Sequence, residues 1–373
     1  MKKKVSRDSG IEFLKILAII IIVTSHVVQT LCSGNQPYSI DITKATTNLQ
    51  YIILLIFRHF GGWGNALFFV CSAWFLLKSN TVNKKKWLFM YIEIWVVSII
   101  ILISTYVILH GEISKKIIIR SILPTIYNNN WYMTCYLVFY PIHSMLNVII
   151  KHMRQTILFR SSIYLAFLYI GFNFVFGGGM FFTSNLILWI TIYFVIAYIQ
   201  YFCMDFVCNL KANIQLLVFN IICFVGIIAL TEFMGLHFTS LSNKMMYWDN
   251  NCNPFLIGMS IAMFNIAQNI HFTNRIVNYI SSLSSLIYII HENLIIRTYF
   301  RPKLWNYIYS NYGYHYILGW VFIAVVVVFL FGTILAILYE LTIRKFVSLL
   351  SNKIYQFLKI KYICVEKKIL KIT

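Results

Sequence analysis

Residues 11–31 read IEFLKILAIIIIVTSHVVQTL, and this almost unbroken apolar run decides the fold of the whole chain. A helix rises 1.5 Å per residue, so about 21 residues cross a hydrocarbon core of roughly 30 Å. The preceding MKKKVSRDSG is basic and predicts a cytoplasmic amino end. A cleaved signal peptide is the alternative, but its apolar core spans only about 7 to 15 residues. We therefore predict a retained transmembrane helix.

Three ionisable residues interrupt this apolar helix. Glu12 and Lys15 are three residues apart, on one face, where they can pair. His26 follows Lys15 by eleven residues, which places it roughly 16 Å further along the axis and close to the same face. Ionisable groups are costly in lipid, so His26 is expected to face protein or a wet cavity. A histidine that only hydrogen-bonds a neighbouring helix is the alternative for this residue.

The composition predicts a polytopic membrane protein. The 373 residues are 60% hydrophobic and 11% charged, whereas about a quarter of the residues of soluble domains are charged. The net charge of +20 can indicate nucleic-acid binding. Most lysines and arginines, however, fall in segments that we predict to be cytoplasmic, so membrane lipids are the expected partner and nucleic acid is not.

The apolar runs predict an all-α bundle of about ten transmembrane helices with both termini in the cytoplasm. Residues 1–343 would form this domain, and residues 344–373 a basic cytoplasmic tail, plausible as a helix on the inner leaflet. An outer segment at 117–127 is expected as a short surface helix; its neighbours Lys115 and Lys116, and Arg120 within it, run against the predicted orientation. The predicted spans are 11–31, 51–78, 87–109, 131–150, 162–176, 185–204, 214–233, 254–270, 276–299 and 316–343.

Cysteines and glycines carry separate expectations. The eight cysteines form no C-x-x-C pair, so neither a metal site nor a disulfide framework is indicated, although Cys32 and Cys252 could both face outward and pair. Gly61, Gly62 and Gly64 interrupt the second span and indicate a close backbone approach or a broken helix lining a cavity.

Further candidate residues lie in two apolar stretches. Ser72 is a hydroxyl in the second span, and a bond to the carbonyl one turn earlier is its ordinary explanation. Trp131 and Tyr132 fit an interfacial aromatic belt. With the three asparagines at 128–130 they equally fit a lip that faces carbohydrate, and the sequence does not separate these readings.

A late stretch, SSLSSLIYIIHENLIIRTYF at 281–300, holds Tyr288, His291, Glu292 and Arg297. Tyr288 and His291 are three residues apart on one helix face. Intramembrane histidines on two separate helices, His26 and His291, favour a role in proton transfer.

Together these motifs resemble acyltransferase family 3, the ten-helix membrane enzymes that O-acetylate surface polysaccharides and related glycans. The family's acidic residue, Leu-Arg and later histidine appear as Glu12, Leu14-Lys15 and His26. Its F-F-x-x-S-G-[FY] motif appears at 68–74, its W-[FY]-x-x-x-Y feature at 131–136 and its Y-L-x-H feature at 288–291. Lys15 stands where the family usually has Arg, which keeps the charge but loses the bidentate fork. Ala73 and Trp74 replace Gly and a smaller aromatic residue.

The resemblance implies a multi-pass O-acyltransferase, expected to be an O-acetyltransferase, of the bacterial cytoplasmic membrane. Cytosolic acetyl-CoA would be its co-substrate, and no metal is expected. The acceptor would be a hydroxyl of a cell-surface polysaccharide, such as a capsule or exopolysaccharide, or of its lipid-linked precursor. Association with glycan export or polymerisation machinery is compatible with this role. A polysaccharide exporter or other transporter without transferase chemistry, and a structural subunit of a polysaccharide synthase, are the alternatives.

The resemblance also implies roles for individual residues. His26 would accept the hydroxyl proton or carry the acyl group briefly, and it is assigned as catalytic with Glu12. Lys15 and Ser72 are assigned to cofactor binding. The residues assigned to substrate binding are Trp131, Tyr132, Tyr288 and His291.

Overall fold

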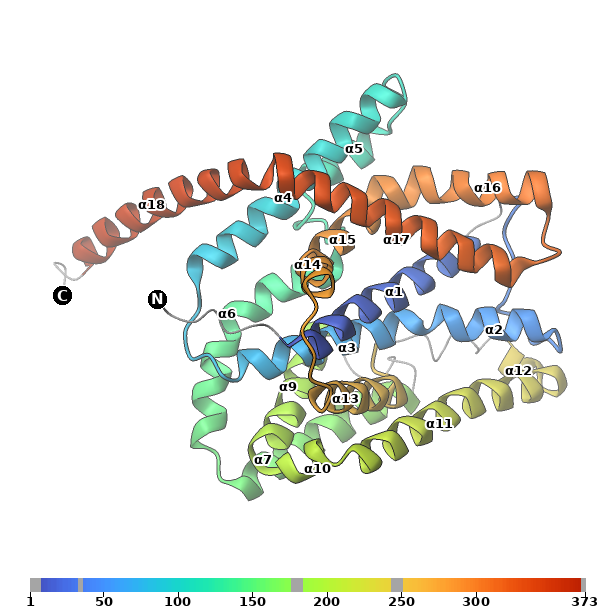
Figure 1. Cartoon of the computed structure of the whole chain (residues 1–373), viewed down its shortest axis with the longest axis horizontal. Helices are drawn as coiled ribbons and strands as arrows, with labels where there is room; N and C mark the ends of the chain where they lie inside the picture. The colour runs from blue at the N-terminus through green and yellow to red at the C-terminus, as the bar shows by residue number, and fades with distance from the viewer. Residues whose placement is uncertain (1–7, 33–35, 176–183, 243–250, 370–373) are drawn as a thin grey trace.

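The computed structural model describes residues 8–32, 36–175, 184–242 and 251–369 and contains only helices among its regular elements (Figure 1). Eight helices in this part of the chain are long and apolar enough to cross a membrane. The prediction of an all-α polytopic membrane protein is therefore confirmed. The basic residues at 2–7, on which the predicted orientation depends, lie outside the described residues.

Six of the eight candidate spans are formed by single helices, α1 (Ser9–Leu31), α4 (Lys84–Ile108), α6 (Trp131–His152), α9 (Asn185–Phe202), α11 (Leu210–His237) and α17 (Ile317–Thr342). The span over Leu49–Leu76 joins α2 (Leu49–Arg58) to α3 (Phe60–Leu76). The span over Gln155–Val175 joins α7 (Gln155–Leu165), the π-helical turn η1 (Ala166–Gly171) and α8 (Phe172–Val175). The apolar helix α13 (Pro254–Gln268) is shorter.

Three further helices are short and lie between the spans. They are α5 (Lys115–Ile122), α10 (Met204–Cys208) and α12 (Thr239–Ser242). The expected short helix after the third span is thus present as α5. At the carboxyl end, α18 (Arg344–Ile369) follows α17 and packs along α4. The first residue of α1 and the end of α18 point toward the same end of the bundle (Figure 1), and the cytoplasmic placement of that end stays a prediction.

The predicted continuous span at 276–299 is divided in the structure. It consists of α14 (Arg275–Ser282), α15 (Ser284–His291), the π-helical turn η3 (Ile296–Phe300) and α16 (Arg301–Tyr312). Glu292 and Asn293 form the break, and both are buried. Asn293 Oδ1 accepts a hydrogen bond from Ile295 N at 3.0 Å and so starts the next turn. Irregular backbone at membrane depth is tolerated where protein surrounds it, which is the case here.

Helix α1 lies at the centre of the bundle and makes its most extensive contacts with α3 (Figure 1). The predicted close backbone approach is confirmed at this interface. A Cβ at Gly64 would lie 2.5 Å from Ile22 Cγ1 and 2.7 Å from Ala18 O. A helix break is also present, but it lies at His59, just before the glycines, which are inside α3; there the Arg58 carbonyl accepts a 2.6 Å hydrogen bond from Ser25 Oγ of α1. The pairing of Cys32 with Cys252 is not formed, because neither cysteine is in a disulfide.

Gly64→Ala should destabilise the protein, because the new methyl group meets backbone and a packed isoleucine at the α1–α3 contact. Overpacking of this kind costs about 1–3 kcal/mol. The matched control is Gly226→Ala in α11, where an added Cβ meets nothing within 4 Å. Thermal unfolding of the detergent-purified proteins should show a lower midpoint for the Gly64 variant alone. Equal midpoints for the two variants would contradict the close packing.

Candidate active site

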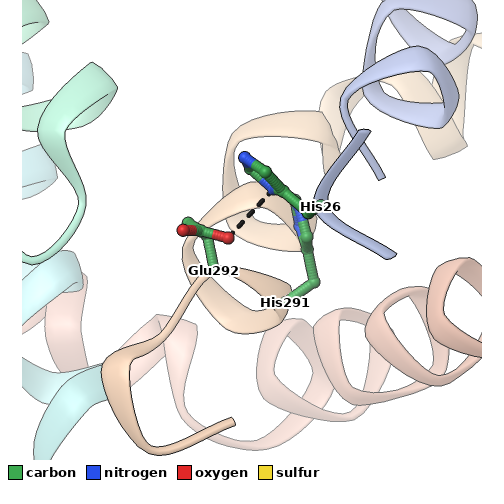
Figure 2. A group of neighbouring side chains, drawn as sticks. All are labelled: His26, His291 and Glu292. Atoms are coloured by element: carbon green, nitrogen blue, oxygen red, sulfur yellow. Dashed lines mark hydrogen bonds and ion pairs between the residues drawn. The ribbon is translucent and has the colours of Figure 1, made fainter. Parts of the chain in front are cut away.

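His26 projects from the carboxyl-terminal third of α1 toward the break between α15 and η3. Its side chain retains only slight exposure, with 8% of the residue surface accessible, and His291 and Glu292 beside it are fully buried. Figure 2 shows the three side chains gathered at this break, with His26 contributed by α1 and the other two by the end of α15. Residues 265 positions apart in the sequence thus meet inside the bundle.

The Nδ1 atom of His26 has two close polar neighbours. Glu292 Oε2 lies 2.9 Å from it and His291 Nε2 lies 3.2 Å from it. The two imidazole rings are 5.4 Å apart between centroids. In Figure 2 the other nitrogen of His26 points away from Glu292, and no described residue is hydrogen-bonded to it.

These contacts define which nitrogen of His26 carries the proton. His291 Nδ1 lies 2.8 Å from the Ile287 carbonyl, which can only accept, so this nitrogen of His291 is the donor. In the neutral ring His291 Nε2 is then an acceptor, as is the carboxylate of Glu292. Because both neighbours of His26 Nδ1 accept, that nitrogen bears the hydrogen. In the neutral ring the lone pair is therefore on His26 Nε2, where it can take up a proton.

Two arginines hold the Glu292 carboxylate. Arg301 donates from Nη2 to Glu292 Oε2 at 2.6 Å, and Arg297 donates from Nη1 to Oε1 at 3.0 Å. Arg301 is buried and also donates to the His291 carbonyl. A buried carboxylate is stable when it is paired and its lone pairs are hydrogen-bonded. The arginines thus keep Glu292 ionised beside His26.

The same three side chains have a spacing that a metal ion could use. Their ligand atoms, one each from His26, His291 and Glu292, lie within 4.8 Å of one another. Glu292 Oε2, however, is already bonded to His26 and to the guanidinium of Arg301, and a second cation at that oxygen would be repelled. The donor set therefore suits proton transfer better than metal binding.

A line of aromatic rings leads from the histidines toward α6. Tyr288 lies 5.5 Å from His291, Tyr132 lies 5.6 Å from Tyr288, and Trp131 lies 5.7 Å from Tyr132, all between ring centroids. Tyr132 Oη is buried and has no hydrogen-bond partner in the described part of the chain. The structure thus brings together His26 and the four residues assigned to substrate binding.

The other assigned residues lie at the opposite end of α1. Glu12 pairs with Lys15 at 3.1 Å, as expected from their spacing, and accepts a short hydrogen bond from Ser281. Lys15 Nζ lies 5.8 Å from the ring centroid of Phe75, one turn beyond Ser72 on α3. Ser72 itself donates to the Phe68 carbonyl at 3.1 Å, its ordinary bond. Glu12 therefore does not contact His26, and Glu292 is the carboxylate that does.

Sequence reasoning assigned no role to Glu292 or Arg301. The available signal was the Glu292 charge directly after an intramembrane histidine, followed by arginines five and nine residues later. Intramembrane charges of opposite sign are expected to pair. Because the segment was predicted as one straight helix, the turn that returns Arg301 to Glu292 was missed.

The fold and the site define a class: a polytopic membrane protein in which a buried imidazole–carboxylate pair is equipped for group transfer. A family model described as an acyltransferase domain matches residues 8–339. The chain belongs to acyltransferase family 3 and is a membrane acyltransferase. No curated protein and no solved structure gives a significant match to the chain.

Arg301→Leu should reduce folding of the protein, because it leaves the buried Glu292 carboxylate without its closest cation. Breaking a buried ion pair from one side costs about 3–5 kcal/mol. Arg297→Leu should cost less, since that side chain is 37% exposed and water can replace it. Membrane abundance and thermal midpoints of both variants measure the difference. A milder effect at position 301 than at position 297 would show that Arg301 does not hold the carboxylate.

Proposed function

We propose that the protein is an O-acyltransferase that moves an acyl group, expected to be acetyl, from cytosolic acyl-CoA to a hydroxyl of a cell-surface polysaccharide or its lipid-linked precursor. The observation that carries this proposal is the 2.9 Å contact between His26 Nδ1 and Glu292 Oε2. In the neutral ring this contact places the hydrogen on Nδ1, so His26 Nε2 carries the lone pair and can accept a hydroxyl proton.

The chemistry follows from this arrangement. The acceptor hydroxyl gives its proton to His26 Nε2 while its oxygen bonds to the thioester carbonyl carbon. Glu292 stabilises the imidazolium that forms, much as the acidic member of a catalytic triad does. As the carbon–sulfur bond breaks, the imidazolium returns the proton to the departing thiolate. The products are the ester and free CoA, and His26 regains its initial state.

The opposite end of α1 supports a donor entrance. Lys15, Lys78 and the ring of Phe75 gather there, with Lys78 Nζ 6.0 Å from the same ring centroid. Ammonium groups attract phosphate as point charges, so we assign Lys15 and Lys78 to the CoA phosphates. Glu12 would hold Lys15 in place through their 3.1 Å ion pair. Ser72 would line the same entrance.

The aromatic rings that lead from His291 to Trp131 support a carbohydrate acceptor. Trp131 and Thr134 line a cavity of about 350 Å³ together with Asn128 and Asn185. Ring faces and amide groups are the chemistry that binds sugars. Tyr132 and Tyr288 lie between this cavity and His291, where they would position the sugar chain. The alternative functions, a polysaccharide exporter and a structural subunit of a synthase, are not favoured, because the family is one of acyltransferases.

His26→Ala should abolish acetylation of the surface glycan, because no other described imidazole nitrogen takes the position of His26 Nε2. The control is His152→Ala, which changes an exposed histidine at the far end of α6. Glu292→Gln should lower activity by about 10²–10⁴-fold, since the neutral amide no longer supports the imidazolium. Mass analysis of glycan from cells expressing each variant measures the acetyl content. Ordinary acetylation in cells with the His26 variant would refute the assignment.

Lys15→Ala should raise the KM for acetyl-CoA with a smaller change in kcat, because a lost phosphate contact weakens donor binding. Lys15→Arg restores the residue usual in the family and should keep or lower the KM. Steady-state release of CoA by purified protein gives both constants. An unchanged KM in the alanine variant would place the donor phosphates elsewhere.

A further inference from the structure

We infer that helix α5 is a docking surface for an anionic glycan, so that the acceptor carries carboxylate or phosphodiester groups. This inference rests on the proposed function, because it specifies the substrate class of the same site. It is carried by three features of α5: its unpaired charges, its attachment to the element that holds Glu292, and its position beside the cavity at Trp131.

The three basic residues of α5 outnumber the one acidic residue close to them in the sequence, the exposed Glu112. Lys115 and Lys116 are exposed, Arg120 is half-buried, and no ion pair joins any of them to a described acidic residue. By contrast, Lys44 in another loop pairs with Asp41 at 3.7 Å. Exposed cations close together create a positive potential that attracts anions over about 10 Å at 0.1 M salt.

Part of the apolar side of α5 is attached to the site, while Ile119 and Ile122 are exposed. Ile117 and Ile118 pack with Tyr299 and Phe300 of η3 around the buried Ile295. Tyr299 Oη also accepts a 3.3 Å hydrogen bond from Ser114 N at the start of α5. The basic helix is therefore joined to the segment that directly follows Glu292.

The other end of α5 is joined to the beginning of α6. Arg120 Nε donates to Asn129 Oδ1 at 3.3 Å, and the Arg120 carbonyl accepts a 2.7 Å bond from Asn129 Nδ2. The next residue, Asn130, donates to the Ile289 carbonyl of α15 at 3.4 Å. Asn128 and Trp131 on either side line the cavity assigned to carbohydrate. A chain bound along α5 would therefore lie beside this cavity and the break that holds Glu292.

The basic residues of α5 lie at an end of the bundle where an anionic partner would account for them. Helix α5 connects the end of α4 to the start of α6 and projects from the other helices (Figure 1). In the predicted orientation this end is extracellular, where clustered lysine and arginine are disfavoured. An anionic lipid headgroup is the competing partner for a basic amphipathic helix. Ile117 and Ile118 are packed against η3, whereas Ile119 and Ile122 are exposed, so binding of glycan and of lipid must each be measured. Arg297, which pairs with Glu292, adds a partly exposed cation on the side of the site.

The test measures binding without requiring acyl transfer. The full chain is reconstituted in phosphatidylcholine nanodiscs, and fluorescent polygalacturonate oligomers are compared with neutral maltooligosaccharides of equal length. The wild type should bind polygalacturonate, with an affinity that falls as salt rises, and should bind the neutral oligomer much more weakly. Equal binding of the two oligomers, or none of either, would overturn the inference.

Lys115→Gln combined with Lys116→Gln should weaken polygalacturonate binding by about tenfold at low salt, as expected for two lost charge contacts. The control Lys44→Gln removes a paired lysine and should change nothing. Binding of acetyl-CoA, measured on the same proteins without glycan, should be equal in all three, because Lys15 and Lys78, which are assigned to the donor, are unchanged. If the double variant binds polygalacturonate normally but loses phosphatidylglycerol in native mass spectrometry, the surface serves lipid and the inference fails. If no protein binds acetyl-CoA but polygalacturonate binding follows the charges, the proposed function fails and the docking surface stands.

Discussion

The Glu292 carboxylate is the interaction on which the rest of the site depends. One oxygen is shared by His26 and Arg301, and the other is bonded to Arg297. A buried carboxylate without partners would cost several kcal/mol, so the chain must return both arginines to it. The break after His291 makes this possible, because a straight helix would carry Arg301 more than two turns away along its axis. The break in the backbone is therefore needed for the buried charge of Glu292 to be paired.

The same requirement accounts for the central position of α1. An imidazole can be kept in a defined tautomer only if its partners are fixed, and α1 is fixed on several sides. Gly64 lets α3 approach its backbone closely, and Trp305 of α16 donates to the Val27 carbonyl at 3.1 Å. Arg301 also reaches the His26 carbonyl at 3.5 Å. The helices that hold the carboxylate thus also hold the histidine.

Much of this was accessible from sequence, because membrane spans follow from hydropathy and intramembrane histidines are rare. The glycines at 61, 62 and 64 predicted a close backbone approach or a helix break in the second span, although not that α1 is the helix that approaches, and the Glu12–Lys15 spacing predicted their pairing. The partner of His26 was not accessible, since pairing depends on the backbone turn at Glu292 and Asn293, which apolar periodicity does not reveal. Ser72 is the opposite case: a bond to the carbonyl one turn earlier was its ordinary explanation from sequence, and the structure shows that bond to Phe68.

In the proposed reaction, the separation of Lys15 from His26 along one helix limits how the donor and the acceptor can meet. Eleven residues of helix span roughly 16 Å, so a donor whose phosphates stay at Lys15 must extend its thioester along α1 to reach the imidazole. An extended pantetheine arm is of comparable length, whereas a compact donor would stop short. The acceptor, entering past Trp131 and Tyr132, would meet the thioester from the other side of His26. The ester would then form where Glu292 is buried and water is largely excluded, which favours transfer to the sugar over hydrolysis.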